Sequence, residues 1–181
     1  VDGSNPATDW HGLLSVDESP NVVNPPVGWL YNSNDAPWNA AGAASPRKAD
    51  YPSYVERGGA SARGRHAVRV LQNSRGFTLD SLLAAAYDSY LPWFERTIPA
   101  LARAWDQAAA ADPLKARLAE QVALLRGWDL RWSVPSVATS LAVFWADILA
   151  RRSGPAARSA QQPVEEYVAD HATPAQLLGA L

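Results

Sequence analysis

The chain has 181 residues, of which 48% are hydrophobic and 19% are charged, and its formal net charge is −2. This length suits one domain, or part of a larger one, and is enough to bury a core. The slightly acidic balance and the lack of a basic run argue against nucleic acid as the main partner. No apolar stretch approaches the ~20 residues that a membrane-spanning helix needs. Because the chain has no cysteine, it cannot form disulfides, zinc–thiolate sites or thiol nucleophiles.

Two further features of the composition bear on function. The chain begins at Val1 and contains no methionine, so we expect a product cleaved from a precursor or an internal segment of a longer protein. Its three histidines are His11, His66 and His171, and each is isolated in sequence from an obvious serine or acid partner. This inventory does not predict an independent Ser-His-Asp hydrolase.

Residues 1–62 are predicted to be rich in loops. Within them, residues 24–38 read NPPVGWLYNSNDAPW, and Pro25, Pro26 and Gly28 exclude a helix. Residues 28–31 predict one short strand, and residues 32–35 predict a turn. Residues 39–62 are small, polar and interrupted by glycine and proline, which predicts a long loop. A strand that ends beside several amides and aromatic rings is suited to fixing hydrogen-bond donors in a partly dry site.

Residues 63–151 are predicted to form a helical subdomain, and residues 152–181 a linker followed by short helices. Thr78 and Ser136 are good N-caps, and Pro113 suits a first helical position. The apolar stripes, which include Leu82 and Phe144, are expected to be core. The predicted helices cover residues 65–72, 79–87, 93–107 with a kink or restart at Pro99, 113–127 and 137–151; after a linker at residues 153–162, Pro163 and Thr173-Pro174 begin the last two. The expected fold class is α+β, in which short strands and a long loop precede a mainly helical part.

A distinctive motif joins Asn24-Pro25-Pro26-x-Gly28 to Asn32-x-Asn34-Asp35-x-Pro37. Other landmarks occur in a fixed order around it. They are Trp10-His11-Gly12, the arginines Arg63, Arg65 and Arg69, the helix from Thr78 with Asp88, Trp128-Asp129, and residues 136–145. In this order the features resemble the penicillin amidase family of N-terminal-nucleophile acylases, which includes penicillin, acyl-homoserine-lactone and aculeacin-type acylases. Residues 151–181 match the family only weakly. The sequence around Asn34, Pro37 and Trp38 is closer to that of the lactone and aculeacin-type enzymes than to that of the penicillin G enzymes.

The resemblance implies an internal segment of the large (β) subunit of an autoproteolytic precursor. The family fold is an αββα sandwich, to which this segment would contribute one or two strands, the long loop and a helical subdomain. Its partners would be the remainder of the large subunit, the small subunit and a small acyl amide substrate, in a periplasmic or secreted enzyme with no cofactor. The reaction would be hydrolysis of a linear amide through an acyl-enzyme on an N-terminal serine outside these residues, whose α-amine has a pKa near 8 and acts as the base. The isolated segment is expected to be inactive.

The resemblance also assigns Asn34 as the side-chain donor of the oxyanion hole. A neutral NH₂ group held rigidly before Pro37 can be preorganised for charge that develops in the transition state, where loss of a donor typically costs ~3–4 kcal/mol. The alternative for Asn34 is an Asx-turn amide that bonds its own backbone. Asn32 competes for the same role, and we interpret it as structural.

Several other residues receive a supporting or structural interpretation. Arg63 or Arg65 is expected to steady the asparagine by binding the oxygen of its amide, with a solvated helix-start arginine as the alternative. The three aromatic residues of the motif are candidates for contact with an acyl chain, with packing as the alternative: Trp29, Tyr31 and Trp38.

The acidic residues outside the motif do not predict a catalytic or metal site. His11 beside Asp9 is interpreted as part of a surface turn. Asp88 and Asp129 are expected to cap or pair. Asp50 alone is too little to predict the structural calcium that some family members hold, so no metal or cofactor is predicted. The rival to the enzyme interpretation is a non-catalytic helical scaffold or interaction module that retains the family's surface.

Overall fold

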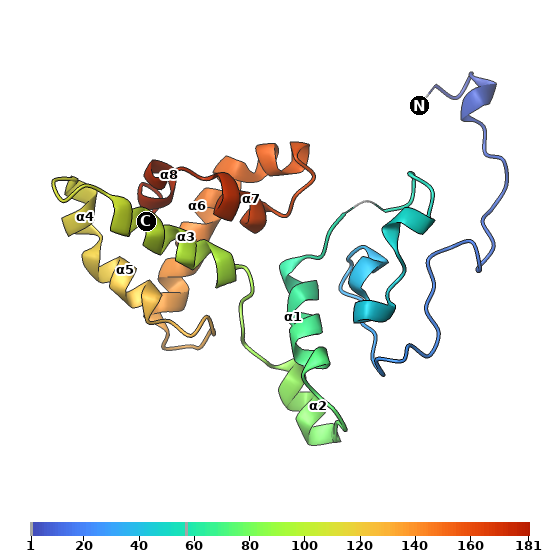
Figure 1. Cartoon of the computed structure of the whole chain (residues 1–181), viewed down its shortest axis with the longest axis horizontal. Coiled ribbons are helices and arrows are strands. Elements are labelled where there is room, and N and C mark those ends of the chain that lie inside the picture. Colours follow the sequence, from blue (N-terminus) through green and yellow to red (C-terminus); the bar gives the residue numbers. More distant parts are fainter. Residues whose placement is uncertain (1, 57) are drawn as a thin grey trace.

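The computed structural model describes residues 2–56 and 58–181, so the chain start at Val1 lies outside the described residues. The chain divides into a loop-rich part up to residue 61, a pair of helices, and a bundle formed by the rest of the chain (Figure 1). The first residues of the loop-rich part, drawn in blue, run away from the helices as an extended arm toward the N-terminus. The candidate site residues therefore lie between the arm and the helical part.

The strand predicted at residues 28–31 does not form. In the described part of the chain, the loop-rich region holds only short 3-10 turns, at Pro6–Thr8, Pro37–Asn39, Gly42–Ala44 and Lys48–Asp50. Gly28 has a φ of +78°, which is incompatible with an extended strand, and the backbone N–H of Tyr31 donates to Ala40 O within the same loop. Without a neighbouring strand among the described residues, an extended run cannot be recruited into a sheet. The described part of this α+β candidate is thus mainly helical.

The helix pair follows the loop-rich part. Helix α1 (Ala62–Gln72) starts at the N-cap Ser61, whose Oγ accepts from the backbone N–H of Gly64 at 3.2 Å. Helix α2 (Leu79–Ala86) starts at Thr78, as the sequence predicted, with a reciprocal capping box to Ser81. Both starts satisfy backbone donors that a helix leaves unpaired at its N-terminus.

The bundle consists of α3 (Phe94–Gln107), α4 (Pro113–Arg117), α5 (Ala119–Arg126), α6 (Val137–Ser159), α7 (Val164–His171) and α8 (Pro174–Leu178). Helix α3 lies at its centre, against α5, α7 and α8, and α6 packs on α5 and α7. The largest fully buried side chains all belong to this bundle: Trp145, Leu101, Leu125, Leu149, Val122, Val168 and Thr97. The indole Nε1 of Trp145 donates to the carbonyl of Leu177 at 2.9 Å, so even the last helix is fixed to the core.

Three predictions about the helices were wrong in part. Helix α6 continues through most of the expected linker and ends at Ser159, although Pro155 inside it removes one backbone donor. Packing explains this continuation, because Ala157 beyond the proline is buried and α6 lies against α7. Helix α3 likewise runs through Pro99 without a restart. The single helix predicted at residues 113–127 is divided at Leu118 into α4 and α5.

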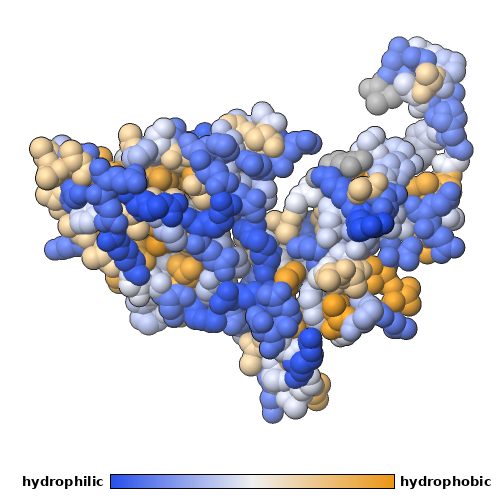
Figure 2. Space-filling view, viewed as in Figure 1, coloured by the Kyte–Doolittle hydropathy of each residue, from blue (hydrophilic) through white to orange (hydrophobic). Residues whose placement is uncertain are grey.

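Not every apolar stripe is buried. Leu79 on α2 is 87% exposed and Phe144 on α6 is 71% exposed, although both belong to stripes predicted to be core. Leu82, Leu83 and Tyr87 extend the exposed stripe of α2. The loop-rich part also shows apolar surface, drawn in orange in Figure 2. Apolar periodicity therefore predicted where most helices lie, but it did not predict which faces of these helices are buried.

Candidate functional site

The candidate site is the loop formed by residues 24–38, called here the motif loop. A backbone hydrogen bond spans the second half of this loop: the N–H of Tyr31 donates to Ala40 O at 2.9 Å. The phenol of Tyr31 donates to Asn39 Oδ1 at 2.8 Å. Between these contacts, Ala36 is buried and Pro37 starts a 3-10 turn. The turn residues 32–35 are thus held at both ends.

Asn32 and Asn34 have different roles in this turn. The side-chain oxygen of Asn32 accepts from the backbone N–H of Asn34 at 2.8 Å, which is an Asx turn. Asn34 has a φ of +60°, in the left-handed region that asparagine tolerates better than most residues. Its side chain is exposed and makes no hydrogen bond within the described part of the chain. The Asx turn considered for Asn34 is therefore made by Asn32.

Asp35 lies against helix α1. One of its carboxylate oxygens, Oδ2, accepts from Ser33 Oγ at 3.0 Å. A Cβ placed on Gly64, in the first turn of α1, would overlap this carboxylate and would lie 2.7 Å from the phenol oxygen of Tyr31. Burial raises the pKa of Tyr31, and the nearby negative charge of Asp35 raises it further. The motif loop thus packs against α1 at Gly64, where the absence of a side chain leaves room for Asp35 and Tyr31.

The two candidate arginines do not contact Asn34. Arg63 is exposed. Arg65 donates to Glu165 Oε1 on α7 at 2.5 Å, and another of its nitrogens lies 3.5 Å from a carboxylate oxygen of Glu166. Glu165 is buried, so Arg65 supplies the charge that this carboxylate needs. The structure therefore joins Arg65 to the bundle and does not bring either arginine to the turn.

The three aromatic candidates pack within the loop-rich part. The edge of the Trp29 indole lies against Gly42, where a Cβ would come within 3.2 Å of the ring. Trp38 donates from Nε1 to the carbonyl of Glu56 at 3.1 Å and stacks on Tyr51 with ring centroids 5.6 Å apart. Trp29 also lines a surface hollow of about 450 Å³ next to Asn24. Packing is what the structure shows for these rings, with one face of Trp29 left beside a hollow.

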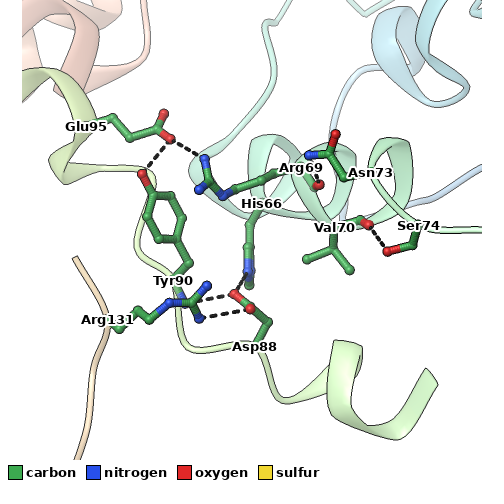
Figure 3. A network of polar contacts seen from close by, with 9 residues as sticks. All are labelled: His66, Arg69, Val70, Asn73, Ser74, Asp88, Tyr90, Glu95 and Arg131. Atoms are coloured by element: carbon green, nitrogen blue, oxygen red, sulfur yellow. Dashed lines mark hydrogen bonds and ion pairs between the residues drawn. The ribbon is translucent and has the colours of Figure 1, made fainter. Parts of the chain in front are cut away.

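A polar network that the sequence did not predict as a unit joins α1 to the segment that follows α2 and to Arg131 (Figure 3). Asp88, which follows α2, is 2.8 Å from His66 Nε2 through Oδ1 and 2.9 Å from Arg131 Nη1 through Oδ2. Burial opposes ionisation of Asp88, but the hydrogen bonds from His66, Arg131 and the backbone N–H of Tyr90 outweigh it and lower its pKa to about 2. Asp88 was expected to cap or pair, and it does pair.

Tyr90 extends this network toward α3. Its phenol donates to Glu95 at 2.7 Å, the guanidinium of Arg69 lies 3.8 Å from its ring centroid, and its backbone forms an isolated antiparallel bridge with Arg131. The partners come from residues 66–69, 88–95 and 131, which are separate in sequence. No local pattern therefore signals the network, and only the capping position of Asp88 after a helix hinted at it.

The remaining candidates are placed as follows. Both carboxylate oxygens of Asp50 are bonded to Arg47, at 2.8 and 3.0 Å. No group of three potential metal-ligating side chains was found in residues 2–56 and 58–181. Within the same ranges, none of the helices combines the length and the apolar character of a membrane span. His11 and Asp9 are both exposed, as expected for a surface turn.

Comparison with protein families gave one result that spans nearly the whole chain. The family described as penicillin amidase matches residues 1–177. The match includes the motif loop, the helix pair and most of the bundle.

Proposed function

The chain belongs to the penicillin amidase family, and we propose that it is the part of an amide-hydrolysing acylase that supplies the asparagine of the oxyanion hole. The nucleophile in this proposal is an N-terminal serine outside residues 1–181. Its hydroxyl oxygen attacks the carbonyl carbon of a linear acyl amide, and its own α-amine takes the hydroxyl proton. The α-amine then passes this proton to the nitrogen of the substrate's amide, and the substrate's amine leaves as the acyl-enzyme forms. Water then releases the acyl group.

The observation that carries the proposal is the contrast between Asn34 and its neighbours. Asn32, Ser33 and Asp35 all use their side chains within the loop. Asn34 alone among these four turn residues presents an exposed carboxamide without a partner in the described part of the chain, on a backbone that is fixed on both sides. A donor that is held in place before the reaction and not used in the resting loop is suited to bind negative charge that develops later.

Asn34→Gly tests this role. Glycine accepts the left-handed backbone of Asn34, so the variant removes the amide without adding the strain that alanine would bring. In the full-length protein, assayed on a panel of acyl p-nitroanilides, we expect normal precursor processing and a kcat lower by roughly 10²–10³-fold. KM should change little, because the interaction is made mainly in the transition state.

Asn24→Gly is the matched control. Asn24 lies in the same loop, is also exposed and has a φ of +49°, so it undergoes the same substitution on a similar backbone. It should keep kcat within about threefold, as expected for a surface change away from the reacting atoms. Unchanged turnover by Asn34→Gly would remove Asn34 from the site.

The alternative is a non-catalytic helical scaffold that keeps the family's surface. The exposed stripe of α2 (Leu79, Leu82, Leu83 and Tyr87) fits either a scaffold or a segment that packs on further polypeptide. The enzyme proposal takes that further polypeptide to be the remainder of the large subunit and the small subunit. An active full-length protein whose turnover is indifferent to every change in the motif loop would favour the scaffold.

The proposed substrate class rests on the amino-acid sequence of the motif. Asn34-Asp35-Ala36-Pro37-Trp38 resembles the acyl-homoserine-lactone and aculeacin-type enzymes, so the proposed substrates are acyl-homoserine-lactone or lipopeptide amides in preference to penicillin G. A periplasmic or secreted location is part of the same proposal.

A further inference from the structure

The close approach of Asp35 to α1 requires glycine at position 64. Gly64 is buried in the first turn of α1, and the Asp35 carboxylate occupies the space that any other residue's Cβ would need. The phenol oxygen of Tyr31 borders the same space. Two side chains of the motif loop thus meet one point on the helix.

The position is also electrostatically favourable for Asp35. The first turn of a helix carries partial positive charge, which stabilises a carboxylate placed there. Ser61 already caps the N–H of Gly64, so Asp35 adds a contact to the turn without replacing its cap. Ser33 fixes the carboxylate from the other side by donating to Oδ2.

These contacts restrain the residue that follows Asn34 directly. On the other side, the Asx turn of Asn32 restrains the Asn34 backbone N–H. We infer that Asp35, seated on Gly64, is a positioning residue that aims the Asn34 carboxamide at the reacting carbonyl. This inference rests on the proposed function, because it supplies the rigidity that an oxyanion donor needs. A shift of ~1 Å in such a donor is enough to cost up to ~100-fold in rate.

Gly64→Ala directly tests the contact between Asp35 and α1. The added methyl group would displace the Asp35 carboxylate, and in the full-length protein we expect kcat to fall by roughly 10- to 100-fold while KM stays nearly constant. Gly154→Ala is the matched control. Gly154 also lies within a helix, α6, where a Cβ would meet only the end of Arg158 at 3.5 Å. The control should keep full activity, with an unchanged or higher Tm.

Substitutions at Asp35 make the test independent of overpacking at Gly64. Asp35→Ala should lower kcat by roughly tenfold, again with little change in KM. Asp35→Asn keeps the shape and the oxygen at the contact, and it should remain within roughly fivefold of the wild type. A side chain that only stabilised the fold would change Tm and the yield of processed enzyme, without this separation of kcat from KM.

The double variant Asp35→Ala/Gly64→Ala decides whether the two residues act through one contact. With the carboxylate gone, the extra methyl group meets only the end of the Tyr31 side chain, so the double variant should be little slower than Asp35→Ala alone. Multiplicative losses, or a Gly64→Ala enzyme within twofold of the wild type, would overturn the inference.

Measuring Asn34→Gly in the same series separates the two proposals. If that variant retains full kcat, the proposed function itself fails. If it loses kcat as expected while the Asp35 and Gly64 variants do not, only the positioning role fails.

Discussion

At the scale of single residues, the motif loop divides two tasks between two identical side chains. Asn32 uses its amide oxygen to shape the turn, and Asn34 occupies the left-handed position that the turn creates. Because an Asx turn needs only the oxygen and an oxyanion hole needs the NH₂ group, the two residues should differ in their tolerance of aspartate.

Aspartate substitutions measure this difference. Asn32→Asp keeps an oxygen acceptor for the Asn34 N–H and should leave kcat within a few-fold of the wild type. Asn34→Asp replaces the donor by a negative charge facing a developing oxyanion, so kcat should fall by at least ~10²-fold. Steady-state kinetics of the two variants in the full-length protein, with Tm as a check on folding, makes the comparison. The reverse ranking would assign the catalytic amide to Asn32.

The limits of sequence analysis are also visible at this scale. Asn34 was selected because the motif resembles a known family. Turn chemistry suggested an Asx turn for Asn34, and the structure places that turn on Asn32, which was interpreted only as structural. The partner of Arg65 could not be predicted, since Glu165 is 100 positions away and nothing local distinguishes a helix-start arginine that binds it from one that binds an amide. The space over Gly64 was likewise invisible, because a glycine in a helix gives no sign of what approaches it.

At the scale of elements, α1 is the connector of the molecule. Successive residues contact different parts of the chain: Gly64 contacts the motif loop, Arg65 contacts α7, and His66 contacts Asp88. The Asp88 carboxylate in turn holds Arg131, which precedes α6. The position of α1 therefore depends on polar pairs more than on a shared apolar core.

This dependence predicts a loss of stability in acid. The pKa of Asp88 is lowered from 3.8 to about 2, so its contribution is fully present above pH ~4 and is lost as the pH falls from ~4 to ~2. Its side chain is 26% exposed, and the contribution amounts to at most about 2 kcal/mol. Urea unfolding of the wild type and Asp88→Asn should differ by this amount at pH 6 and converge near pH 2.

Asp147→Asn is the control for this experiment. Asp147 pairs with Arg151 one turn away on the surface of α6, where both side chains are largely exposed. Such pairs contribute ~0.5 kcal/mol or less, so this variant should track the wild type at both pH values. A difference between wild type and Asp88→Asn that persists unchanged at pH 2 would contradict the ionic role of Asp88.

The helices were predictable from the sequence largely where a cap or a proline marks them. Thr78, Ser136, Pro113 and Thr173 all lie where the sequence placed them, because a cap is a local interaction between a side chain and its own backbone. The predicted strand failed because a strand depends on a partner that is not local. The expected linker failed because packing of Ala157 outweighed the missing donor of Pro155.

At the scale of the whole molecule, burial is concentrated at one end. The bundle α3–α8 has a continuous core, whereas the arm exposes large apolar side chains such as Trp10, which is 88% exposed. The two parts should therefore differ greatly in local stability when the 181-residue chain is studied alone.

Hydrogen exchange followed by mass spectrometry tests this difference. Peptides from α3 and α6 should exchange only through cooperative opening, and peptides from residues 2–23, ahead of the motif loop, should exchange close to their intrinsic rates. The bundle peptides are the internal control, because they are measured in the same sample. Strong protection across residues 2–23 would contradict the proposal that this part needs further polypeptide to become ordered.

The ion pair between Arg65 and Glu165 has a consequence for the order in which the chain assembles. Helix α1, which contacts the motif loop, is linked through Arg65 to Glu165, which is synthesised 100 residues later. At ~5–20 residues per second, a ribosome needs about 5–20 s to cover that interval. During that time α1 lacks its partner on α7. The motif loop is therefore synthesised well before the residue that secures its supporting helix.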